Sequence, residues 1–98
     1  MTVKAVPTRD LVGHLTSKGF REDSDDRDHH YFFLWLAGKK QMLRVKLSRG
    51  AKEIAREEIR RNAYSFGLTG DDLYKILSCE HDALTTAQVW RASSKYKP

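Results

Sequence analysis

The chain has 98 residues, of which 40% are hydrophobic and 32% charged, which excludes a wholly disordered protein and predicts a single domain over 1–98. One cysteine excludes an intramolecular disulfide, and no apolar run reaches the roughly 20 residues of a membrane span. Residues 1–7 lack the apolar stretch of a signal peptide, so we expect a cytoplasmic protein that does not enter a membrane.

The net charge of +5 favours a polyanionic partner, nucleic acid first. The acids concentrate in 22–28 and in 53–58, whereas 38–52 contains cations and no acid. The segment 38–52 is therefore the candidate phosphate-facing surface. Its cations are Lys39, Lys40, Arg44, Lys46, Arg49 and Lys52.

The first predicted element is an amphipathic helix over about 8–18, which Thr8 can cap and Gly19 ends. The charged run 21–28 follows, and we expect a solvated loop in which a short strand can begin. The apolar face of the helix consists of Leu11, Val12 and Leu15.

Two strands joined by a tight turn are predicted next. Residues 29–37 are rich in aromatic and bulky aliphatic side chains, and 41–47 alternate between apolar and polar ones. A two-residue turn at Gly38-Lys39 would make the numbers of paired residues sum to 77.

This register gives the hairpin two different faces. The core face would hold His30, Phe32, Leu34 and Leu36 against Leu43, Val45 and Leu47. The other face would place Tyr31 opposite Lys46, Phe33 opposite Arg44, Trp35 opposite Met42 and His29 opposite Ser48. Rings that stack on bases, beside cations that meet phosphates, are typical of RNA-binding modules. The alternative is that the C-terminal segment or a partner chain covers these rings, and a partner could also compete with RNA.

Helices are predicted for the rest of the chain. The first covers about 51–65, a second follows the capping-box-like sequence 69–72, and 85–90 can add one or two turns. This order of elements predicts an α+β fold, with helices on one face of a small antiparallel sheet. The expected buried residues are Ala55, Ile59, Ala63, Phe66, Leu73, Ile76 and Leu77.

The adjacent histidines His29 and His30 leave three interpretations open. They could bind zinc with two further histidines of the chain, although no local spacing indicates such a site. They could be structural, or they could be catalytic. Motifs for P-loop nucleotide hydrolysis and for α/β-hydrolase chemistry are absent from the sequence.

Five short strings, by their order and spacing, make the sequence resemble the HicA-like toxins of type II toxin–antitoxin systems. The strings span about 8–80, the expected core, and leave 81–98 as a C-terminal extension. The resemblance implies a double-stranded-RNA-binding-domain-like α-β-β-β-α fold, here with an additional C-terminal helix, and cleavage of mRNA. The strings are LVGHLTSKGF (11–20), DHHYFF (28–33), GKK (38–40), RVKLSRGAK (44–52) and LSC (77–79).

The resemblance also implies roles for individual residues. The histidine that starts a strand in the family corresponds here to His29, with His30 as the close alternative. It would act as general acid or base on the ribose 2′-OH or the leaving 5′-oxygen, without a metal or small-molecule cofactor. The predicted RNA-binding residues come instead from the outer face of the hairpin and from the basic segment. They are Tyr31, Phe33, Lys39, Lys40, Arg44, Lys46, Ser48 and Arg49.

The implied partners are mRNA and a HicB-like antitoxin protein that covers the active site. Two positions depart from the family pattern, because Arg27-Asp28 stand in place of Gly-Ser and Ser48-Arg49-Gly50 lacks a histidine. The alternatives are therefore a non-catalytic RNA-binding module of the same fold, or a protein-interaction or DNA-binding accessory domain.

Overall fold

The secondary structure is that of an α+β protein, as the sequence predicts. The computed structural model describes residues 3–23, 29–48, 50–78 and 80–97, with the backbone alone for His29. Strands β2, β3 and β4 form an antiparallel sheet in that order, and β1 pairs with β5 in a separate two-stranded sheet. The elements are β1 (Val6–Pro7), α1 (Leu11–Ser17), β2 (Phe20–Glu22), β3 (His29–Leu36), β4 (Lys39–Ser48), β5 (Glu53–Ile54), α2 (Arg56–Ser65), α3 (Gly70–Leu77) and α4 (Ala83–Arg91).

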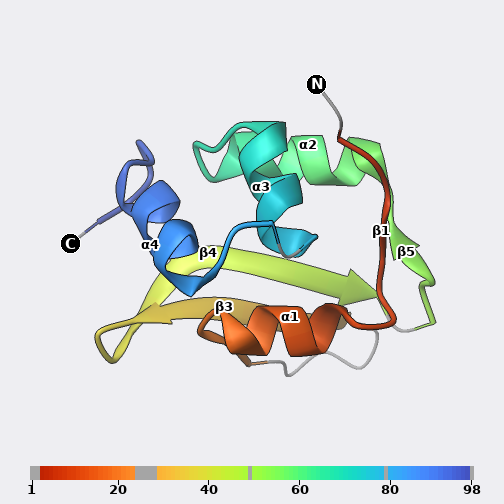
Figure 1. The fold of residues 1–98 in the computed structure, drawn as a ribbon, viewed down its shortest axis with the longest axis horizontal. Helices are drawn as coiled ribbons and strands as arrows, with labels where there is room; N and C mark the ends of the chain where they lie inside the picture. Colours follow the sequence, from red (N-terminus) through yellow and green to blue (C-terminus); the bar gives the residue numbers. More distant parts are fainter. Residues whose placement is uncertain (1–2, 24–28, 49, 79, 98) are drawn as a thin grey trace.

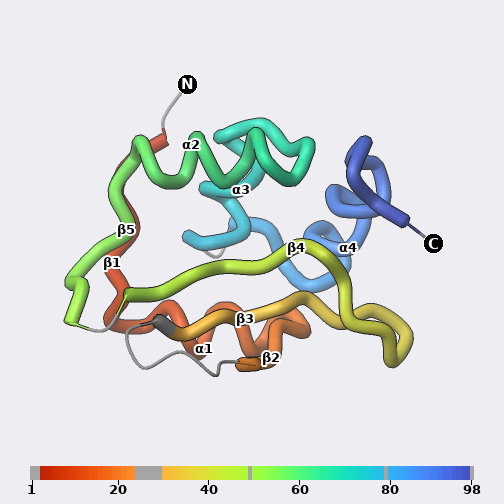
Figure 2. Tube along the Cα trace, turned by 180° about the vertical axis from the view of Figure 1, so that it is seen from behind, coloured from red at the N-terminus to blue at the C-terminus, as the bar shows by residue number. Residues whose placement is uncertain are grey.

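The core lies between the helices and one face of the three-stranded sheet. Figure 1 shows α1 and α4 in front of the strands, and Figure 2, seen from behind, shows β3 and β4 in front of those helices. Helix α2 lies alongside β4, on the side away from β3, in both views. The predicted core face of the hairpin is confirmed by the burial of Phe32, Leu34, Leu43, Val45 and Leu47. The helices add Leu11, Leu15, Ile59, Ala63, Leu73, Ile76, Leu77 and Trp90 to the same cluster.

The hairpin turn lies one residue earlier than predicted. Leu36 pairs with Lys39, so the turn is Ala37-Gly38 instead of Gly38-Lys39. Both turn residues have positive φ, 50° at Ala37 and 77° at Gly38. This is the requirement of a type I′ turn, whose twist suits a hairpin and which favours glycine at the second position.

The predicted register holds over most of the hairpin and shifts near the turn. It is correct from the open end up to Phe33 and Arg44, whereas Trp35 lies opposite Lys40 and not opposite the expected Met42. One residue of β3 thus lies opposite three of β4, a bulge that absorbs the shift. Because the shift is by two residues, the two faces keep their predicted composition.

Two helices begin later than predicted, because β1 and β5 pair with each other. The hydroxyl of Thr8, the expected cap of the first helix, donates to the carbonyl of Ala51 at 2.7 Å. Ala55 is the exposed N-cap of α2 and does not belong to its buried stripe. Val12 of α1 is 48% exposed, so it is not part of the buried face of that helix.

The last two helices begin at side-chain caps. Thr69 Oγ1 accepts the backbone N–H of Asp72 at 3.0 Å, as the capping-box sequence predicts. Asp82 Oδ1 accepts the backbone N–H of Thr85 at 2.8 Å, and this bond lowers the pKa of the Asp82 carboxyl. Because these caps satisfy free N–H groups, they fix where α3 and α4 begin.

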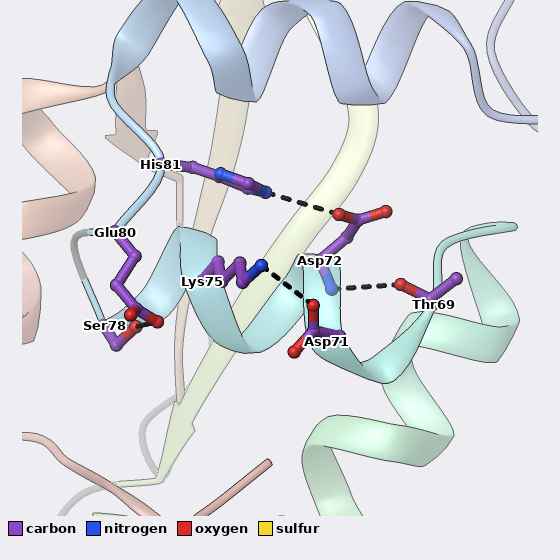
Figure 3. Close-up of polar contacts among 7 residues, drawn as sticks. All are labelled: Thr69, Asp71, Asp72, Lys75, Ser78, Glu80 and His81. Atoms are coloured by element: carbon purple, nitrogen blue, oxygen red, sulfur yellow. Dashed lines mark hydrogen bonds and ion pairs between the residues drawn. The ribbon is translucent and has the colours of Figure 1, made fainter. Parts of the chain in front are cut away.

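Charged side chains connect α3 with the segment that leads into α4 (Figure 3). His81 Nε2 lies 3.3 Å from Asp72 Oδ1, and Lys75 Nζ lies 3.1 Å from Asp71 Oδ2. The hydrogen bond and the charge of Asp71 raise the pKa of Lys75. No helix in the described part of the chain is both long enough and apolar enough to cross a bilayer.

Candidate nucleic-acid interface

One face of the three-stranded sheet is covered by no described helix (Figure 2). On this face a row of aromatic side chains from β3 lies opposite a row of basic side chains from β4. Side chains of a strand point alternately to its two faces, and the residues between these positions are buried in the core. The rings are half-buried and the cations are exposed. We call this surface the basic aromatic face; it consists of Arg21, Tyr31, Phe33, Trp35, Lys40, Arg44 and Lys46.

The cations of this face lie over its rings. Lys40 Nζ is 4.1 Å from the ring centroid of Phe33, and Arg21 Cζ is 4.8 Å from that of Trp35. Arg44 Cζ lies 6.0 Å from the centroids of both Tyr31 and Phe33. These distances fall within the range of cation–π attraction, so rings and cations hold one another in place before any ligand arrives.

Helix α2 borders the basic aromatic face on the β4 side. Phe66, at the end of α2, has its ring centroid 5.9 Å from Arg44 Cζ. A recess of about 200 Å³ lies between α2 and the sheet, and we call it the α2 recess. It is lined by Tyr31, Arg44, Lys46, Asn62, Ser65 and Phe66.

Two further recesses continue from the α2 recess along β4. One of about 390 Å³ shares Tyr31 and Arg44 with it and also contains Asp23, Phe33 and Lys40. The other, of about 350 Å³, shares Lys40 with the second. Because each recess shares at least one residue with the next, we call this line of recesses from α2 to the C-terminal segment the track. Its far end lies beside Trp90 of the helix-covered core and shares only Lys40 with the rest. The third recess is lined by Lys40, Gln41, Met42, Trp90, Lys95 and Lys97.

Helix α4 does not cover the rings of the basic aromatic face. Trp90 of α4 is fully buried in the core, and its Nε1 donates to Gln41 Oε1 at 3.0 Å. The rings are instead partly covered by the cations of their own sheet. One acid also reaches this face, because the Asp23 carboxylate forms an ion pair with Lys40.

His30 lies on the opposite face of β3 from Tyr31 and Phe33. It pairs with Leu47, and its Nδ1 forms a hydrogen bond with the carboxylate of Glu22. The imidazole is 30% exposed, at the margin of the core. The structure therefore does not bring His30 together with the cations of the basic aromatic face.

The other predicted site residues lie in different positions. Lys39 is exposed and pairs with Leu36, so its register position belongs to the helix-covered face. Ser48 is exposed at the end of β4, opposite the backbone of His29. The His29 side chain and Arg49 lie outside the described residues.

Several residues of the interface are absent from the sequence prediction. Arg21 belongs to a charged run that resembles a loop, and only its pairing with Phe33 places it on the face. Asn62 and Phe66 reach the site through the packing of α2 against the sheet. Residues 20–22 are one apolar residue followed by two charged ones, which gives no alternating signal for Arg21. Helix α2 likewise carries no local signal for its contact.

No three His, Cys, Asp or Glu side chains within the described ranges are grouped as metal ligands would be. The chain matches no family model, and comparisons with curated proteins and with solved structures found no match. Function is therefore argued from the site itself.

Proposed function

We propose that the protein binds single-stranded RNA across the basic aromatic face. The observation that carries this proposal is a row of aromatic rings on β3 opposite a row of cations on β4, on a face free of described helices. Each base stacked on an aromatic ring contributes about 1–3 kcal/mol to binding, and every base has a face that can stack. The exposed cations add the salt-dependent attraction to phosphates.

We further propose that the bound RNA is cleaved, and that the protein is an mRNA endoribonuclease toxin of the HicA-like kind. His29 is the proposed general acid or base, since its backbone pairs with Ser48 at the end of β4, two residues from Tyr31. Arg44 or Lys46 would stabilise the negative charge that grows on the phosphate. In this proposal a HicB-like antitoxin protein covers the same face and keeps the toxin inactive.

A second candidate function is RNA binding without cleavage. It is favoured by the position of His30, whose imidazole lies on the opposite face and is bonded to Glu22. Among the described side chains, no imidazole lies on the basic aromatic face. Catalysis therefore depends on His29, whereas binding depends on neither histidine.

The test is cleavage of mRNA in EDTA by wild type and by His29→Ala, His30→Ala and His14→Ala. We expect His29→Ala to lose about 100-fold or more in rate, which is typical when a general acid or base is removed. His14 of α1 serves as the matched control because it lies outside the interface, and its substitution should leave the rate unchanged.

The outcomes separate the two candidate functions. If wild type binds RNA and does not cleave it, the result supports the second candidate function, RNA binding without cleavage. If cleavage is lost in His30→Ala alone, then His30, paired with Glu22, is the catalytic histidine and His29 is not. Wild type with no affinity for RNA at low salt would contradict both candidate functions.

A further inference from the structure

The α2 recess combines three kinds of side chain that a nucleobase site needs. The half-buried ring of Tyr31 forms an apolar wall, and the ring of Phe66, which is only 7% exposed, closes the recess from the core. The Arg44 guanidinium lies about equally far from both rings, at 6.0 and 5.9 Å. Asn62 and Ser65 add neutral polar groups from α2. Neutral hydrogen-bonding groups read the edges of bases, whereas cations alone serve phosphates of any sequence.

We infer that the α2 recess holds one adenine of the bound RNA and that Asn62 determines this specificity. The inference rests on the proposed RNA binding and goes beyond it by naming the base and the residue that reads it. Lys46, which is exposed beside the recess, supplies charge for the flanking phosphate.

The amide of Asn62 is available to a ligand. It is half-buried, and within the described chain it forms no side-chain hydrogen bond. An amide offers one acceptor oxygen and two donor hydrogens. The combination of an acceptor and a donor is complementary to adenine, in which an amino group that donates lies next to a ring nitrogen that accepts. The amide is not occupied by the described fold, so its donor and acceptor are open to a ligand.

Ser65 strengthens the preference for a base with an amino group. Its hydroxyl donates to the carbonyl of Arg61 at 3.1 Å, which leaves the hydroxyl oxygen as an acceptor. The second hydrogen of the adenine amino group can use that acceptor. Cytosine carries the same edge pattern, but its smaller ring offers less area to stack on Tyr31.

The experiment measures binding to fluorescent 2′-O-methyl hexamers, which lack the hydroxyl needed for cleavage. The probes are an all-uridine hexamer and three versions with one central adenosine, cytidine or guanosine. We expect wild type to bind the adenosine probe about tenfold more tightly than the all-uridine probe, a ratio typical of one bidentate base contact.

Asn62→Ala should reduce this ratio to about twofold or less. Asn62→Asp, which removes the donor and keeps the shape, should lose the ratio too and provides a second test. The matched control is Gln88→Ala, which removes an exposed amide from α4 and should keep the full ratio.

The possible results distinguish this inference from the proposed function. RNA binding without a preference for adenosine, or with a preference that survives both Asn62 variants, overturns the inference and keeps the proposed function. A preference for another base overturns the assignment to adenine. Absence of binding to any probe at low salt contradicts the proposed function itself.

Discussion

Lys18 is a charged residue whose side chain lies inside the core, only 3% exposed. It forms the C-cap of α1, and its ammonium donates to the carbonyl of Ile76 in the last turn of α3. The last carbonyls of a helix have no partner within it, and they carry the negative end of its dipole. A buried cation at this point therefore satisfies an acceptor and joins α1 to α3.

We predict that Lys18→Ala lowers the free energy of unfolding by about 2 kcal/mol. The loss of buried methylenes at about 0.8 kcal/mol each and of a donor to a buried carbonyl exceeds the gain from not burying an ammonium. Urea denaturation measures the change, with the exposed Lys52→Ala as control. Lys18→Met, which keeps most of the stem, should lose less. Wild-type stability of Lys18→Ala would refute this role.

The turn of the β3–β4 hairpin contains a residue with a strained backbone conformation. Ala37 has a φ of 50°, a conformation that costs a residue with a Cβ roughly 1 kcal/mol and that asparagine tolerates best. We predict that Ala37→Asn stabilises the protein by about 0.5–1 kcal/mol, which raises Tm by roughly 4 °C. Scanning calorimetry would measure the shift.

The control for the turn is Gly38→Ala. A Cβ on Gly38 would meet no atom within 4 Å, so this change tests the backbone alone, with its φ of 77°. Tm should fall in this variant. An unchanged Tm in both variants would mean that the turn does not require positive φ.

The elements that could be predicted from the sequence are those with a local pattern of apolar and polar residues. The faces of the hairpin follow from strand alternation, so the core position of Phe32 and the outer position of Phe33 are both correct. The starts of α1 and α2 are not predictable in this way, because 6–7 and 53–54 pair across more than 40 residues of chain. Neither partner carries a local signal for the other.

The residues of the candidate site also fall into two groups, those that a local pattern predicts and those that only tertiary packing brings to the site. Arg44 and Lys46 lie on the basic aromatic face because apolar and polar residues alternate along β4, and this alternation is visible in the sequence. Asn62 and Phe66 reach it only because α2 packs beside β4, which depends on the whole core. Their own helix shows Phe66 as one more buried apolar residue, so its contact with Arg44 could not be predicted.

At the scale of the whole molecule, a line of cations follows β4. The cations of the basic aromatic face and the C-terminal lysines line the track along β4. Figure 3 shows Asp71 and Asp72 in the first turn of α3 and Glu80 after the end of that helix, with Lys75 and His81 among them.

The track predicts that Lys95 and Lys97 contact phosphates even though they lie in the C-terminal segment. On single strands, each neutralised phosphate contributes about 0.7 to the slope of log affinity against log salt. Replacing both lysines by glutamine should reduce the slope by about 1.4. Lys4→Gln with Arg9→Gln removes the same charge from exposed residues elsewhere, and this pair should leave the slope unchanged. Equal slopes in the two double variants would show that the charge acts at long range and that RNA does not follow the track to the C-terminal segment.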